Sequence, residues 1–117
     1  MKYRAAYPLY VREIPMQPQT QRRRVPRYSF KAASVVTEIG SPRIVVAPTS
    51  DLSRFGCFVQ APSPFPQGTR IHIEMVHEET TFVAFGKVAY ATGEGMGIVF
   101  STVEADDQAI LEKWLVE

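Results

Sequence analysis

The stretch TRIHIEMVH alternates between apolar and polar side chains, and this period constrains the fold more than any other feature. Ile71, Ile73 and Met75 fall on one side of an extended chain, and His72 and Glu74 fall on the other. A period of two is typical of a β-strand that buries one face. The segment therefore predicts a half-buried strand.

Five further stretches have the composition of strands, because they are rich in β-branched and aromatic residues. They are YSFKAASVVTEI, RIVVA, FGCFVQA, TTFVAFGKVAYAT and MGIVF, separated by turn signals such as Gly-Ser-Pro and a proline-rich loop. The period changes in EADDQAILEKWLVE, where Ile110, Leu111, Trp114 and Leu115 share one helical face. The sequence therefore predicts a mainly β fold: a small six-stranded antiparallel barrel with a C-terminal α-helix.

Residues 1–21 are expected to form an N-terminal arm or linker, because Pro8, Pro15 and Pro18 prevent a regular helix. The apolar side chains of this arm predict that part of it is ordered by packing. The total of 117 residues favours a single domain, which we place at residues 22–117. With 45% hydrophobic residues the chain is able to bury a core, which argues against global disorder.

The single cysteine, Cys57, cannot form an internal disulfide and fits a reducing compartment. Its apolar neighbours in FGCFV predict a buried, unreactive thiol. The N-terminal stretch has no continuous apolar segment, and no run approaches the ~20 apolar residues of a membrane-spanning helix. We therefore expect a cytoplasmic protein without a membrane span. The net charge of +1 predicts no general affinity for polyanions such as DNA.

Basic residues are concentrated in QRRRVPRYSFK, and no acidic residue occurs between Glu13 and Glu38. Arg23 and Arg27 are four positions apart, but Pro26 excludes a helix interior. In an extended chain the two residues face one way, with Cα atoms ~13 Å apart. Guanidinium groups fork onto phosphates, fork onto the guanine edge and stack on flat bases. Charge alone favours the plainer interpretation, a solvated basic arm.

A second candidate stretch is DLSRFG, in which Asp51 and Ser53 share a face of an extended chain while Leu52 points inward. Their oxygens suit the N1–H and N2–H₂ donors of guanine. Gly56 would let the backbone approach a ligand closely or adopt a positive φ. The alternative interpretation is an ordinary Asx or Ser/Thr turn.

Together the two stretches resemble the PilZ family of bacterial cyclic-di-GMP receptors, with R-x-x-x-R in RRRVPR and [D/N]-x-S-x-x-G in DLSRFG. The segments PQGTRI, FGKVAYA, GMGIVF and DDQAILEKWL follow in the order typical of that family, so the resemblance covers roughly residues 20–116. It implies a split barrel that binds cyclic-di-GMP. The implied ligand-binding residues are Arg22, Arg23, Arg27, Asp51, Ser53 and Gly56, although the resemblance does not decide whether Arg22 touches the ligand. It also implies that the arginine segment folds over the ligand.

The main functional prediction is a non-enzymatic receptor for this second messenger that signals through a partner protein, in processes such as motility or biofilm formation. One alternative is a PilZ-type interaction adaptor in pilus or motility machinery that binds no nucleotide. Another is a small barrel for single-stranded RNA, which would expose several aromatic residues on one sheet face, whereas the aromatic residues here fall mostly at core positions. The sequence leaves open the partner, the pathway, the nucleotide stoichiometry, the role of the arm and whether the chain forms a homodimer.

No catalytic residues and no cofactor are expected, since no nucleophile and base share a recognisable spacing. His72 and His77 are predicted on opposite faces of a strand, which argues against a metal site. Glu78 and Glu79 are interpreted as turn residues, and Trp114 as packed on the barrel. The glycines of GEGMG are predicted to shape a bend between strands.

Overall fold

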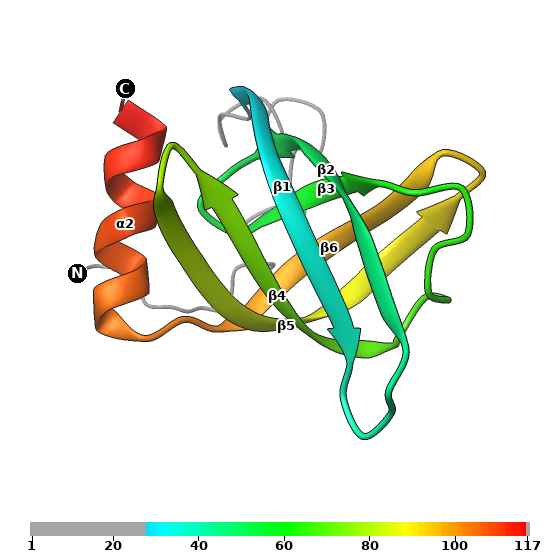
Figure 1. Cartoon of the computed structure of the whole chain (residues 1–117). Helices are drawn as coiled ribbons and strands as arrows, with labels where there is room; N and C mark the ends of the chain where they lie inside the picture. Colours follow the sequence, from blue (N-terminus) through cyan, green and yellow to red (C-terminus); the bar gives the residue numbers. More distant parts are fainter. Residues whose placement is uncertain (1–27, 117) are drawn as a thin grey trace, which may run out of the picture.

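The computed structural model describes residues 28–116 and shows six antiparallel strands followed by one helix. The strands are β1 (Tyr28–Glu38), β2 (Ile44–Leu52), β3 (Gly56–Gln60), β4 (Arg70–His77), β5 (Thr80–Thr92) and β6 (Gly95–Thr102), and the helix is α2 (Ala105–Val116). The strands close into a barrel in the order β1-β2-β3-β6-β5-β4 (Figure 1). The prediction of a six-stranded antiparallel barrel with a C-terminal helix is confirmed.

The alternating residues of β4 line the inside of this barrel. Ile71, Ile73 and Met75 have no exposed surface, and the same alternation in β5 buries Phe82 and Val88. The core is therefore the barrel interior, as the period of two predicted.

One end of the barrel is covered by α2, which lies beside the β4–β5 hairpin (Figure 1). Trp114 is only 7% exposed and contacts the rings of Phe30, His77 and Phe82. The Asp107 carboxylate accepts a hydrogen bond from the Val83 N–H at 2.9 Å, which fixes the first turn of the helix on β5. The predicted packing of Trp114 on the barrel is confirmed.

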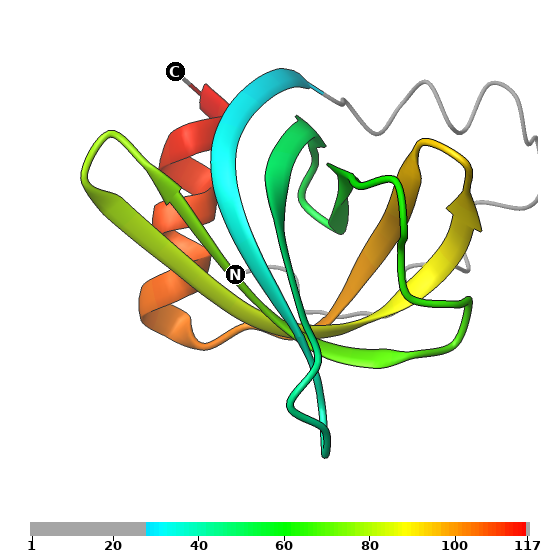
Figure 2. The ribbon, with the colours of Figure 1, turned by 45° about the vertical axis from the view of Figure 1, so that its right-hand side comes forward.

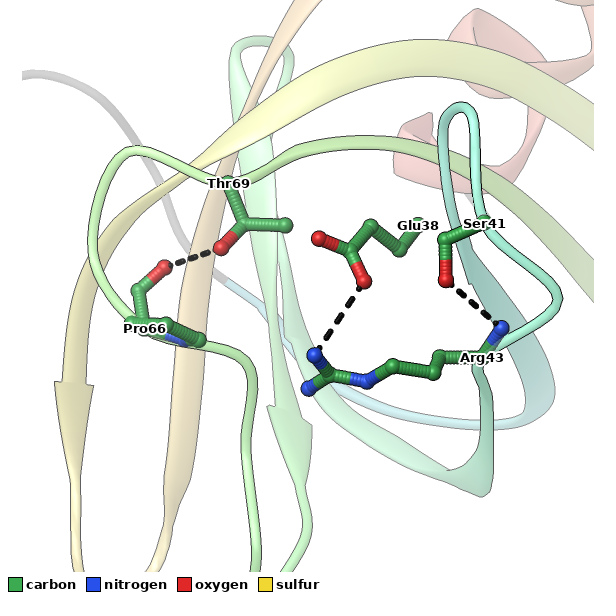
Figure 3. A network of polar contacts seen from close by, with 5 residues as sticks. All are labelled: Glu38, Ser41, Arg43, Pro66 and Thr69. Atoms are coloured by element: carbon green, nitrogen blue, oxygen red, sulfur yellow. Dashed lines mark hydrogen bonds and ion pairs between the residues drawn. The ribbon is translucent and has the colours of Figure 1, made fainter.

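Residues of the β1–β2 hairpin lie near the proline-rich loop that precedes β4 (Figure 3). Arg43 pairs with Glu38 at 3.3 Å, and its guanidinium lies 5.1 Å from the centre of the buried Phe65 ring. In the loop, the Thr69 hydroxyl donates a hydrogen bond to the Pro66 carbonyl. The contact between Arg43 and Phe65 thus joins the hairpin to the loop.

β2 is longer than the short RIVVA strand that the sequence suggested, because it continues through Pro48 to Leu52. Proline lacks an N–H and is usually confined to strand positions where one edge has no partner. Pro48 pairs with Ala33 of β1, whereas the pairing of β2 with β3 begins only at Thr49. The proline therefore interrupts no pairing on the β3 side.

Three smaller predictions are confirmed. Cys57 is buried, and burial raises the pKa of its thiol far above the usual range. His72 packs on Phe85 at the outside of the sheet, whereas His77 packs on Phe30 and Trp114, so the two histidines face opposite ways. Glu78 and Glu79 form the β4–β5 turn, with positive φ angles of 49° and 71°.

Candidate functional site

The direction of Asp51 is set by an irregularity in β2. Thr49 and Asp51 pair with consecutive residues of β3, so Ser50 between them has no counterpart there. This is a β-bulge, a device that re-aims a side chain. In a regular strand Asp51 would share the inner face of the buried Thr49, because residues two apart point the same way. The bulge turns the carboxylate to the outer face, while Leu52 fills the core.

The Asp51 carboxylate is half-buried and lies on the outer face of the barrel. Within residues 28–116 it accepts no hydrogen bond and forms no ion pair. A carboxylate offers up to four lone-pair sites to N–H donors. Asp51 is therefore available to accept hydrogen bonds from a ligand.

Ser53 has a different role, because its hydroxyl closes the β2–β3 turn. The hydroxyl donates to the Gly56 carbonyl at 3.3 Å and accepts from the Phe55 N–H at 3.2 Å, and the Ser53 N–H donates to the same carbonyl at 2.9 Å. The side chain is 7% exposed, so the turn encloses most of it. The alternative interpretation of this stretch, a Ser/Thr turn, is thus confirmed for Ser53, and ligand binding by Asp51 stays a prediction.

Gly56 is required by the barrel itself. Its φ lies outside the left-handed region, so the suggested positive φ is not observed. A Cβ at this position would stand 2.0 Å from the Ile98 carbonyl oxygen of β6. The missing side chain allows β3 and β6 to approach, and the expected role of Gly56 in leaving room for a ligand stays a prediction.

A second bulge lies across the barrel wall in β5. Val88 and Tyr90 pair with consecutive residues of β6, so Ala89 has no counterpart. Val88 points into the core, and the bulge turns Tyr90 to the outer face, where its ring covers Gly97. Gly97 in turn pairs with Phe58 of β3.

Both bulges place side chains in one row across the outer face. Asp51 of β2 lies opposite Phe58 of β3, Phe58 lies opposite Gly97 of β6, and Gly97 lies opposite Tyr90 of β5. Figure 2 shows this part of the wall, with the β2–β3 turn between β1 and the β5–β6 hairpin. Sequence reasoning missed Phe58 and Tyr90 as candidates, because a row across four strands appears only once the register is known.

The arginines Arg22, Arg23 and Arg27 lie outside the described residues. What the structure does show is where the chain enters the barrel after them. β1 begins at Tyr28, and its first two residues pair with Leu52 and Asp51. The described part of the site therefore contains Asp51, Ser53 and Gly56 next to the start of β1.

A groove of about 880 Å³ opens beside this site, lined by residues of β1 and β2 together with Gln60 and the β4–β5 turn. Ser50, the bulge residue, lines it, but Asp51 and Ser53 do not. Asp51 thus sits on open outer surface next to the groove rather than inside it. The described residues contain no group of His, Cys, Asp and Glu side chains placed to hold a metal ion.

A scan against family models matches the PilZ domain over residues 21–117. The chain belongs to the PilZ domain family. The resemblance found in the two sequence motifs is thereby confirmed, and the family to which the chain belongs is one of cyclic-di-GMP-binding receptor and adaptor domains.

Solved structures support the fold. The PilZ domain of CeSA from a cellulose-synthesizing bacterium aligns with a TM-score of 0.64 at 16% identity, covering 78% of this chain and 95% of that one. The Bacillus subtilis inhibitor of motility (MotI/DgrA) aligns with a TM-score of 0.64 at 17% identity, covering 81% of this chain and 49% of that one. This chain thus spans about half of the motility inhibitor. No curated protein matches the sequence. In the described part of this PilZ domain, no helix has the length and apolar character that a bilayer crossing requires.

Proposed function

We propose that this PilZ domain is a cyclic-di-GMP receptor that orders its arginine segment over the dinucleotide and signals through a partner protein. The observation that carries the proposal is the pairing of β1 with β2, in which Ser29 lies opposite Asp51. That pairing places Tyr28 and Ser29, the residues that directly follow the arginine segment in sequence, beside Leu52 and Asp51.

The covalent chain limits how far apart the two halves of the site are able to lie. Consecutive Cα atoms are ~3.8 Å apart, and paired residues of antiparallel strands are ~5 Å apart. Arg27 directly precedes Tyr28, which pairs with Leu52. Tyr28, the residue that the covalent chain joins to Arg27, therefore lies directly beside the Asp51–Leu52 end of β2. The geometry supports convergence of Arg27 and Asp51 on one ligand.

Each residue then has a role that suits its chemistry. Arg23 and Arg27 grip phosphates and guanine edges through bidentate hydrogen bonds, and Arg22 offers one more guanidinium. Asp51 accepts hydrogen bonds from the N1–H and N2–H₂ of a guanine. Ser53 keeps one lone pair after closing its turn, which leaves it able to accept one further bond.

Binding changes the surface that the domain presents. A segment that folds over its ligand becomes a new surface for a partner, and the ligand shifts the equilibrium by its preference for the ordered state. The protein acts in the cytoplasm, where the nucleotide is available, and uses no catalytic residues and no cofactor. Its downstream partner is a protein rather than DNA or a membrane.

Isothermal titration calorimetry with cyclic-di-GMP tests the proposal, with GMP and a short RNA as control ligands. We expect Arg23→Ala or Arg27→Ala to weaken binding about tenfold or more, because one bidentate base contact is worth ~1–3 kcal/mol. Asp51→Ala is expected to cost somewhat less. Arg70→Ala is the matched control, since Arg70 is exposed at the start of β4 and Asp51 pairs only with strands β1 and β3.

Absence of heat with cyclic-di-GMP would contradict the proposal and favour an interaction adaptor that binds no nucleotide. Tighter binding of the RNA than of the dinucleotide would favour a single-stranded RNA module. Equal losses in Arg27→Ala and Arg70→Ala would show that the arginine effect is only a change of net charge.

A further inference from the structure

The outer face carries two aromatic side chains that the two sequence motifs do not include. Phe58 and Tyr90 lie on either side of Gly97, with ring centroids 6.2 Å apart and planes inclined by 27°. A Cβ at Gly97 would stand 2.3 Å from ring carbons of Tyr90. A Cβ at Gly95 would stand 2.1 Å from the Val59 carbonyl oxygen and 2.9 Å from ring carbons of Phe58. The two glycines of β6 thus let the rings lie over bare backbone.

The arrangement leaves aromatic surface open to solvent. Tyr90 is 45% exposed, although an aromatic side chain at a regular position two residues after Val88 would point into the core. The bulge at Ala89 is the reason that it does not. A ring in this position offers apolar surface on which a flat ligand is able to stack.

Asp51 stands at the Phe58 end of this pair. Directly opposed residues of antiparallel strands have Cβ atoms ~5 Å apart, and Asp51 lies directly opposite Phe58. Flat bases stack on aromatic rings, and guanine presents its N1–H and N2–H₂ donors along one edge in the plane of the base. A base resting on the rings is therefore able to direct this edge at the carboxylate.

We propose that Phe58 and Tyr90 form an aromatic ledge that stacks one guanine of the dinucleotide while Asp51 binds the edge of the same base. The inference rests on the proposed function and adds two binding residues to it. The two bulges then have the same role. The bulge at Ser50 turns Asp51, and the bulge at Ala89 turns Tyr90, to the face on which the base lies.

Calorimetric titration of Tyr90→Ala with cyclic-di-GMP tests the ledge. We expect affinity to fall about tenfold or more, equivalent to ~1.4 kcal/mol, while Tyr90→Phe keeps the ring and stays within about threefold of the unmodified chain. Phe85→Ala is the matched control, because Phe85 is also on β5 and is 44% exposed but packs on His72 of β4. It is expected to bind as the unmodified chain does.

Gly97→Ala provides an independent variant. The atoms nearest to the added Cβ belong to the Tyr90 ring, so the substitution displaces the ring without removing it. We expect a loss similar to that of Tyr90→Ala, and no additional loss when the two substitutions are combined. Melting temperatures of all variants are measured alongside.

A double-mutant cycle tests whether Asp51 and Tyr90 hold the same base. Two groups that hold one base are coupled, so Asp51→Ala combined with Tyr90→Ala is expected to lose less than the two single losses multiplied. Multiplicative losses would overturn the shared base, and unchanged binding of Tyr90→Ala would overturn the ledge. If the unmodified chain gives no heat with cyclic-di-GMP, the proposed function fails and the ledge fails with it. If the unmodified chain binds and Tyr90→Ala binds equally well, the ledge alone fails.

Discussion

Replacing Gly56 by alanine separates the structural role of this motif glycine from a role in ligand binding. The added Cβ would lie 2.0 Å from the Ile98 carbonyl oxygen and 3.2 Å from the Val99 Cα, and both atoms belong to the backbone of β6. Neither atom is able to move as a flexible side chain would. Relief requires β3 and β6 to separate by roughly 1 Å or more, which disrupts the pairing of Gly56 with Val99.

Overpacking of this kind costs about 1–3 kcal/mol, and we expect the upper end because the barrel is closed on both sides. A loss of ~3 kcal/mol lowers the melting temperature of a domain of this size by roughly 10 °C or more. Differential scanning calorimetry without ligand measures the change. The matched control is Gly93→Ala, since Gly93 lies in the β5–β6 turn with no atom within 4 Å of an added Cβ.

Gly93→Ala is expected to be neutral or to stabilise by roughly 0.5 kcal/mol, because alanine reduces the freedom of the unfolded chain. If Gly56→Ala melts at the same temperature as Gly93→Ala, the close approach of β3 and β6 is not what requires glycine. A Gly56→Ala protein that keeps its stability and loses only nucleotide binding would assign the glycine to ligand clearance.

Three further outcomes are expected. The double substitution Glu78→Asn and Glu79→Gly should stabilise the fold by ~1 kcal/mol or more, because both turn residues have positive φ and Asn-Gly suits that turn. Urea unfolding measures the change, and lowered stability would contradict the expectation. The hydroxyls of Ser34 and Thr49 are hydrogen-bonded to each other inside the barrel. Ser34→Ala should therefore lower the free energy of unfolding by ~1–3 kcal/mol, and adding Thr49→Val should recover part of this loss. Additive losses of stability would refute the pairing. The affinity for cyclic-di-GMP should weaken with rising salt concentration without vanishing, because salt screens the phosphate contacts while the guanine hydrogen bonds persist. A dissociation constant that does not change with salt in calorimetric titrations would exclude the phosphate contacts.

The strands of the barrel can be predicted from the sequence wherever every second residue is apolar. Ile71, Ile73 and Met75 are all fully buried, and the change of period at the C-terminus places Leu111 and Trp114 on the barrel. In these segments the local pattern and the packing agree, so the pattern alone was sufficient.

Features that depend on pairing between strands were not accessible in this way. A bulge such as that at Ser50 is a mismatch between two strands, and neither strand alone contains the signal for it. Pro48 concealed the continuation of β2 because a proline normally ends a strand pattern.

The aromatic residues show the same limit. Phe58 stands in the apolar run FGCFV and resembles a core residue, yet it alternates with the buried Cys57 and Val59 and faces outward. Phe58 and Tyr90 are thus exceptions to the expectation that aromatic residues lie mostly in the core. The buried pair of Ser34 and Thr49 was also missed, since small polar residues in a strand usually indicate its solvent face.

Nuclear Overhauser contacts between bound cyclic-di-GMP and the isotope-labelled chain test the central claim most directly. We expect protons of one dinucleotide molecule to show contacts with the side chain of Arg27 and, in the same complex, with residues beside Asp51 on the outer face. Contacts to the arginine segment alone, or to the distant outer face around Ile44, would contradict the convergence of the two motifs on one ligand.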